Sequence, residues 1–313
     1  MSTHGDASGS PDDPACAWPH RHDCPVEPAG DRRAGASALS VVLPLRPRGG
    51  PVDGAPLFCL AGEAGPAWSF AALLGHIDPA VPVYGLQPPE ADGPRPRTVG
   101  EYAARYVTEI RRISPHGPYQ LVGWSAGGFV AHEIACVLGA AGAGVRLVVL
   151  GADPGIRAST VTAPAERATV AGSGPSAGEL VARFGPVFGT GAATGDLTAE
   201  AAAARVVSAL AGTVELTGAD IDRIAAAAGA MARATAGHIP ATLPGDMTVV
   251  VANRGSGVDP AAVLRNWRPY VEGTVTAIVL DATHDELLDP ACMPAIAEVL
   301  ASAAADAQAR SVR

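Results

Sequence analysis

Lysine is absent from the chain, so all 22 of its cationic residues are arginines. Acidic residues outnumber them, and the formal net charge is −9 at pH 7. Because the sequence has no basic stripe that could neutralise phosphates, nucleic acid is excluded as the main partner. Apolar runs of membrane-spanning length are also missing, and the N-terminal residues do not resemble a signal peptide. We therefore expect a cytoplasmic protein that does not bind a membrane.

Cysteine is scarce as well. Five cysteines in 313 residues are too few and too scattered for a disulfide scaffold. Cys59 lies in an apolar run that predicts a strand, and Cys136 lies in a predicted helix. Both are therefore expected to be reduced residues of the core.

Residues 1–38 are rich in Pro, Gly, Asp and Ser and have no hydrophobic periodicity. Such a segment cannot bury enough apolar surface to fold, so it is predicted to be a disordered N-terminal tail. Four possible zinc ligands lie within it, at Cys16, His20, His22 and Cys24. Their spacing matches no common zinc module, which favours adventitious metal affinity over a structural site.

From residue 39 onward, short apolar runs alternate with segments of helical spacing. The predicted strands are 40–45, 56–60, 82–86, 119–122, 146–151, 247–252 and 275–280. Helices are predicted near 68–77, 98–113, 129–138 and 294–303, the second of which begins with a capping box formed by Thr98 and Glu101. This alternation implies a mostly parallel central sheet with helices on both faces. Sites in such sheets lie at the carboxyl ends of the strands.

Residues 157–240 interrupt the alternation and are almost free of strand patterns. Helix starts are predicted at Ser176, Thr198 and Asp220. We interpret this segment as a helical lid insertion that lies over the strand ends and shapes the substrate cavity. A packing subdomain without a gating role is the alternative. The catalytic domain is then expected to span 39–304, followed by a short C-terminal tail at 305–313.

The run Gly123-Trp-Ser125-Ala126-Gly127 stands between a predicted strand and a predicted helix. Small residues around a serine at such a junction permit a sharp turn that lifts the hydroxyl out at the strand end. This is the nucleophile elbow of the α/β-hydrolases, in which the backbone N–H after the serine helps to bind an oxyanion. The pattern therefore predicts Ser125 as a nucleophile and the Ala126 N–H as an oxyanion donor.

A serine nucleophile needs a general base, and in this fold the histidine follows the serine and the acid in the chain. His284 comes after the last predicted strand, in Asp281-Ala-Thr-His284-Asp285, and we predict it as the base. The other seven histidines lie in the tail, before the serine, in the helix after it or at the end of the insertion: His4, His20, His22, His76, His116, His132 and His238.

The acid that orients the base has two candidates. Asp153 follows the strand after the elbow helix, and Asp259 follows the next strand. A carboxylate at either strand end could reach the histidine, so the residues alone leave both open. Asp281 and Asp285 are too close to the histidine in the chain to orient it easily, and they are expected to be solvated loop charges.

Taken together and in order, several motifs resemble the thioesterase domains of nonribosomal peptide and polyketide synthases. The resemblance spans about residues 41–304 and includes Leu43-Pro-Leu-Arg46, Pro56-Leu-Phe-Cys-Leu60, Val83-Tyr-Gly-Leu-Gln87, Gly117-Pro-Tyr119, the Ser125 elbow, Asp153-Pro, Trp267 with Tyr270, and the His284 loop. Val83 to Gln87 looks more like the terminal, product-releasing type than the stand-alone editing type. The family position of the acid matches Asp153.

The resemblance also implies that the backbone N–H of Glu63 joins that of Ala126 in the oxyanion hole. Here the sequence departs from the family, because Ala61-Gly62 replaces the usual His-Pro or Pro-Pro. A carboxylate beside an oxyanion would oppose catalysis unless it points away or meets a cation. The Glu63 side chain either binds an amine of the substrate or is a solvated loop residue, and we favour the second.

The resemblance thus implies an α/β-hydrolase fold and a serine thioesterase with Ser125, Asp153 and His284 as its triad. Its partner would be a carrier protein whose phosphopantetheine arm holds an acyl or peptidyl chain, released by hydrolysis or cyclisation. No metal or cofactor is required. A free-standing esterase or lipase for small esters, and a non-catalytic scaffold that binds carrier proteins, are the alternatives.

Overall fold

Seven strands form one sheet, and each begins and ends within two residues of its predicted position. They are β1 (Val42–Arg46), β2 (Leu57–Leu60), β3 (Val83–Leu86), β4 (Tyr119–Trp124), β5 (Val145–Leu150), β6 (Met247–Ala252) and β7 (Val275–Leu280). Their order in the sheet is β1-β3-β2-β4-β5-β6-β7. The β1 strand runs antiparallel to β3, and the other neighbours are parallel. The predicted, mostly parallel sheet is confirmed.

The computed structural model describes residues 39–47, 55–63, 66–88, 95–155, 174–188, 197–209, 215–255 and 257–311. All of these belong to one unit, which spans residues 36–313. The predicted tail at 1–38, with its four possible zinc ligands, lies outside the described residues. Among the described residues, no helix combines the length and the apolar character needed to cross a membrane.

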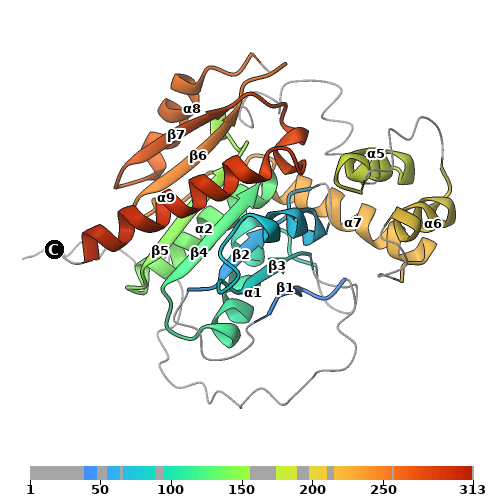
Figure 1. Cartoon of the computed structure of the whole chain (residues 1–313), viewed down its shortest axis with the longest axis horizontal. Coiled ribbons are helices and arrows are strands. Elements are labelled where there is room, and N and C mark those ends of the chain that lie inside the picture. The colour runs from blue at the N-terminus through green and yellow to red at the C-terminus, as the bar shows by residue number, and fades with distance from the viewer. Residues whose placement is uncertain are drawn as a thin grey trace, which may run out of the picture. The chain divides into compact units, whose positions relative to one another are not determined.

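Helices cover both faces of the sheet (Figure 1). One face packs against α1 (Val99–Ile113), α2 (Ala126–Ala140) and α8 (Pro260–Trp267), and the other against the 3-10 helix η1 (Ala67–Gly75) and α9 (Met293–Ser311). The central strand β4 shows why the strands are continuously apolar. Leu121 is buried against the first group of helices and its neighbour Val122 against the second, so both faces of the strand need apolar side chains.

Local capping explains where the helices begin. Thr98 Oγ1 accepts the backbone N–H of Glu101, whose carboxylate accepts the N–H of Arg97, and this arrangement starts α1 as predicted. At the other end of the chain, α9 continues to Ser311. Residues that were expected to form a C-terminal tail from 305 therefore extend the last helix.

In the described part of the predicted insertion lie three helices, namely α5 (Ala177–Phe188), α6 (Ala199–Ala209) and α7 (Gly218–Thr235). They share an apolar cluster of their own, which also includes Trp68 of η1. The α7 helix also packs on α1 and α2, while α5 contacts η1 and the 3-10 turn η3 (Asp285–Leu288). The insertion therefore reaches the loop that carries the predicted base. Figure 1 shows the three helices together beside the β3 side of the sheet.

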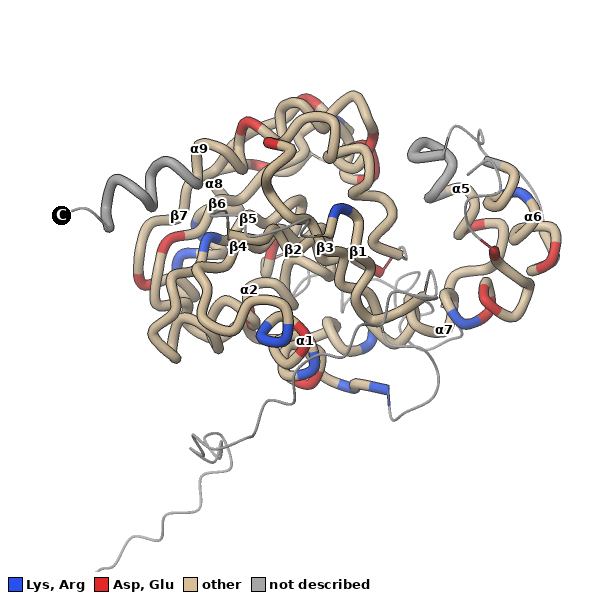
Figure 2. Tube along the Cα trace, turned by 60° about the horizontal axis from the view of Figure 1, so that its bottom comes forward, with Lys and Arg blue, Asp and Glu red and all other residues tan. Residues whose placement is uncertain are grey.

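Two of the described cysteines lie in the core. Cys59 and Cys136 are buried free thiols, and burial raises the pKa of Cys136 to about 12. Both are thus reduced core residues, as predicted. Acidic and basic residues are interspersed along α1 and α7 (Figure 2).

Candidate active site

Ser125 occupies the tight turn between β4 and α2. Its φ of 55° and ψ of −125° are unusual, and no other non-glycine residue in the described part of the chain has a positive φ. Its N–H donates to Leu150 O at 2.9 Å, and its carbonyl accepts the N–H of Gly128 at 2.9 Å. A serine held in a sparsely populated conformation requires support from its surroundings, and such strain is concentrated at functional sites.

The turn depends on two glycines because other backbone segments approach it closely. A Cβ at Gly127 would lie 2.5 Å from Leu60 O, and a Cβ at Gly62 would lie 2.7 Å from Trp124 O and 3.0 Å from Ser125 Cβ. The loop after β2 therefore packs directly against the serine turn. Gly62, the departure from the family pattern, is required by this contact.

The Glu63 side chain is turned toward the helical insertion. The residue is only partly exposed, and Thr235 Oγ1, at the end of α7, lies 3.4 Å from its Oε1. Thr235 itself is fully buried. The carboxylate is thus partly exposed and also lies close to α7, a contact that the sequence did not indicate.

His284 lies against the serine turn, in the loop after β7. Its ring stacks on Trp124 with centroids 5.2 Å apart, and the Trp124 indole N–H donates to His284 O at 3.1 Å. On another side is Gly151, with a φ of 64°, where a Cβ would lie 2.7 Å from His284 Nδ1. The structure thus places the predicted base beside the residue that precedes the predicted nucleophile. Sequence reasoning missed the roles of Trp124 and Gly151, since neither contact is local.

A capping motif holds the His284 loop. Thr283 N donates to Glu286 Oε2 at 2.7 Å, and Glu286 N donates to Thr283 Oγ1 at 3.4 Å. The hydrogen bond from Arg254, in the loop after β6, is the main reason why the pKa of Glu286 falls to about 2. The Thr-x-x-Glu spacing at 283–286 was the sequence signal that could have revealed this support.

Asp153 is buried, with 7% of its surface exposed, two residues after Gly151. Its Oδ1 accepts the N–H of Gly155 at 2.8 Å and the side-chain amide of Asn266 at 2.9 Å. Next to it, the Trp267 indole N–H donates to Ala152 O at 2.8 Å. The end of α8 thus fixes both the carboxylate and its backbone.

Asp259 serves a different purpose. It caps the N-terminus of α8 by accepting the N–H of Ala261 at 2.9 Å, and it forms an exposed ion pair with Arg265 at 3.4 Å. Of the two candidate acids, Asp153 is the buried one, and it lies two residues after Gly151, the glycine that borders the His284 ring. Asp281 and Asp285 are exposed, as expected.

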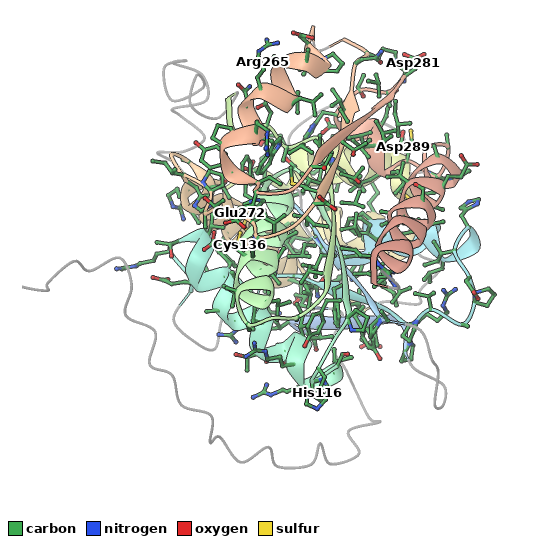
Figure 3. All side chains as sticks on the ribbon, turned by 90° about the vertical axis from the view of Figure 1, so that its left-hand side faces the viewer. His116, Cys136, Arg265, Glu272, Asp281 and Asp289 are labelled. Atoms are coloured by element: carbon green, nitrogen blue, oxygen red, sulfur yellow. The ribbon has the colours of Figure 1, made fainter. Side chains whose placement is uncertain are left out.

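Two other histidines, His116 and His132, are not placed to act as the general base. His116 and Asp281 lie at opposite ends of the domain (Figure 3), so the former is remote from the carboxyl ends of the strands. His132 is fully buried on α2, where its Nε2 donates to Tyr270 O at 3.2 Å. Burial is the main reason why the pKa of His132 falls to about 4, so its imidazole stays neutral at pH 7.

This buried histidine makes the stability of the domain pH-dependent. The unfolded chain binds a proton near pH 6.5 and the folded chain only near pH 4, so stability falls as the pH drops through this window. We expect a loss of about 3 kcal/mol from this group between pH 7.5 and pH 4. Urea unfolding across that range should show a shallower decline for His132→Gln than for the exposed-site control His76→Gln. Parallel declines in the two variants would contradict the assignment.

With the geometry established, comparison with known proteins identifies the family. The family model of the Thioesterase domain matches residues 55–303. The chain belongs to the thioesterase family. The predicted family and α/β-hydrolase fold are both confirmed, and the chain is a hydrolase that acts on thioesters.

Relatives of this thioesterase are parts of large biosynthetic proteins. Malpinin synthetase of Mortierella alpina is 30% identical over 270 residues, which cover 84% of this chain and 3% of the synthetase. Enterobactin synthase component F of Escherichia coli K12 is 35% identical over 127 residues, or 40% of this chain and 9% of the relative. The chain thus spans a small part of the length of either relative.

A solved structure of similar fold is the type II thioesterase BorB from the borrelidin biosynthetic cluster. It superposes with a TM-score of 0.58 at 22% identity, covering 86% of this chain and 99% of BorB. This likeness supports the fold. Within the described part of the thioesterase, no group of three or more His, Cys, Asp or Glu side chains is arranged to hold a metal ion.

Proposed function

We propose that this thioesterase uses Ser125 as its nucleophile to release acyl or peptidyl groups from the phosphopantetheine arm of a carrier protein in natural-product biosynthesis. The observation that carries the proposal is the strained Ser125 turn, which lies beside both the His284 ring and the loop after β2. In such a turn the serine hydroxyl is exposed at the end of the sheet, where substrates of this fold bind.

In the proposed reaction, Ser125 Oγ attacks the thioester carbonyl while His284 Nε2 accepts the serine proton. Asp153 holds the imidazole by its Nδ1–H and stabilises the imidazolium. The tetrahedral intermediate collapses, the C–S bond breaks, and His284 returns the proton to the leaving thiol. The acyl group is left as an ester on Ser125. Water, or an amine or hydroxyl of the chain itself, then attacks this ester with His284 again as the base.

Two backbone N–H groups, of Ala126 and Glu63, are assigned to the oxyanion hole. Ala126 is the first residue of α2, where backbone N–H groups point out of the helix and favour negative charge. The close packing of Gly62 on Ser125 supports the assignment of Glu63, whose amide follows directly in the chain. The contact with Thr235 draws the Glu63 carboxylate toward α7, which reduces its repulsion of the oxyanion.

The carrier-protein partner is inferred from the relatives. They include synthetases and a type II thioesterase from a biosynthetic cluster. The match to malpinin synthetase covers 84% of this chain. A protein of this kind, supplied as a separate chain, would receive its substrate from a carrier in trans.

A combined labelling and substrate experiment tests the proposal. A fluorophosphonate should add once to the protein, and peptide mapping should place the adduct on Ser125. Turnover of carrier-bound acyl thioesters should then exceed turnover of p-nitrophenyl esters of the same acyl chain. Labelling at another residue would overturn the nucleophile, whereas a preference for the nitrophenyl esters would indicate an esterase for small substrates. The absence of labelling would indicate a non-catalytic scaffold.

We also predict that water, rather than a group within the chain, attacks the acyl-enzyme. Cyclisation requires a site that holds the chain in a near-attack conformation and excludes solvent. The insertion at 157–240 is rich in alanine and contains only two aromatic residues, Phe184 and Phe188, so it offers few large side chains to fold a peptide back. A carrier-bound chain with an internal amine should therefore give mainly the free acid by mass spectrometry. A dominant product lighter by one water would make the enzyme a cyclase.

A further inference from the structure

Asn266 is a polar residue near the end of α8 that contacts the proposed site. Its side-chain nitrogen lies 2.9 Å from Asp153 Oδ1, and Asn266 is half-buried. The two residues are 113 positions apart in the chain. No feature of the sequence pointed to Asn266, which is therefore an addition to the predicted site.

In the contact between Asn266 and Asp153, the asparagine is the hydrogen-bond donor. A buried carboxylate can only accept hydrogen bonds when it is ionised, so the amide must donate through its nitrogen. The N–H of Gly155 donates to the same oxygen at 2.8 Å. Two donors on Oδ1 fix the rotation of the carboxyl group. Asn266 is neutral, so it hydrogen-bonds to the carboxylate without neutralising it. An arginine at this position would neutralise it.

The surrounding structure fits this pair closely. Gly155 carries no Cβ, and an added one would collide with the Asn266 amide. The neighbouring residue Trp267 is fully buried and binds Ala152 O, which anchors α8 to the backbone just before Asp153. Val263 is buried as well, so α8 is held in place without help from Asn266. The hydrogen bond from the Asn266 amide to Asp153 is therefore not needed to hold α8 in place.

We propose that Asn266 is a positioning residue of the thioesterase, which fixes the Asp153 carboxyl group so that its second oxygen, Oδ2, faces His284 Nδ1. The proposal rests on the triad of the proposed function. Asn266 touches neither the substrate nor the reacting atoms, and it acts through Asp153. Its loss should consequently weaken the base without changing how the acyl chain binds.

Two substitutions separate this role from a structural one. Asn266→Ala removes the donor, and we expect kcat on an acyl-N-acetylcysteamine thioester to fall roughly 10- to 100-fold with little change in KM. Asn266→Asp is nearly isosteric but places a second carboxylate against Asp153. Like charges raise the pKa of the carboxyl pair, and the added charge also raises the pKa of His284. Both effects should move the acid limb of the kcat/KM profile to higher pH, by about one unit.

The matched control is Asn253→Asp, which adds the same charge at an exposed position after β6. It should leave the pH profile unchanged. Thermal unfolding of all variants reports the fold, and the rate of fluorophosphonate labelling against pH gives a second readout of the base that works for a poorly active variant. Wild-type kcat and pH profile in both Asn266 variants would overturn the role of Asn266. Failure of the wild-type enzyme to label at Ser125 would instead overturn the proposed function.

Discussion

Replacing Ser125 with alanine is expected to lower thioester turnover by roughly 10⁴- to 10⁶-fold and to abolish the acyl-enzyme. The reason is chemical, because the hydroxyl at this turn is the group that we assign to attack the carbonyl. Intact-mass spectrometry after incubation with a carrier-bound acyl thioester should show an adduct on the wild type and none on the variant. Ser302→Ala makes the same change on α9, where the hydroxyl donates to Val299 O, and should retain the adduct.

The strain at Ser125 allows a check that the loss does not come from unfolding. Alanine meets the same steric cost as serine at a φ of 55°, so Ser125→Ala should unfold at nearly the wild-type temperature. Glycine tolerates this backbone conformation, so Ser125→Gly should be inactive yet more stable, by about 1 kcal/mol. An acyl adduct that persists in the alanine variant would show that another residue is the nucleophile.

Much of the fold was predictable because its causes are local. The strand β6 begins and ends where its apolar run does, since both faces of the sheet are covered there. The start of α5 follows from reciprocal hydrogen bonds between Ser176 and Glu179. The start of α1 follows from equally local bonds, in which Glu101 donates to Thr98 and accepts from Arg97. Residues this close in the chain can form these hydrogen bonds without any tertiary contact, so the sequence alone predicts them.

The supports of the site were less predictable because they join distant segments. Thr235 meets Glu63 across 172 positions, and Trp124 meets His284 across 160. Sequence patterns narrowed the acid to two strand ends but could not tell which of them is buried. The structure separates them by environment, since Asp153 is enclosed between Gly155 and Asn266 while Asp259 caps a helix in solvent.

This difference predicts opposite results for the same substitution at the two acids. In Asp153→Asn, the donors from Gly155 and Asn266 must still face an acceptor, so the new amide oxygen takes the place of Oδ1. Its NH₂ group then replaces Oδ2, the oxygen that we assign to His284. A donor there would force the imidazole to carry its proton on Nε2, where it cannot accept a proton from Ser125.

We therefore expect Asp153→Asn to lower kcat by roughly 10⁴-fold, as the wrong tautomer does in serine proteases, with little change in the fold. Asp259→Asn should retain activity, because asparagine caps a helix N-terminus about as well as aspartate and the pair with Arg265 is exposed. Steady-state turnover of one acyl thioester by both variants, with thermal unfolding as the fold control, makes the comparison. A large loss in Asp259→Asn together with an active Asp153→Asn would move the acid to the end of β6. It would also leave the bonds between Asp153 and α8 as contacts of the fold alone.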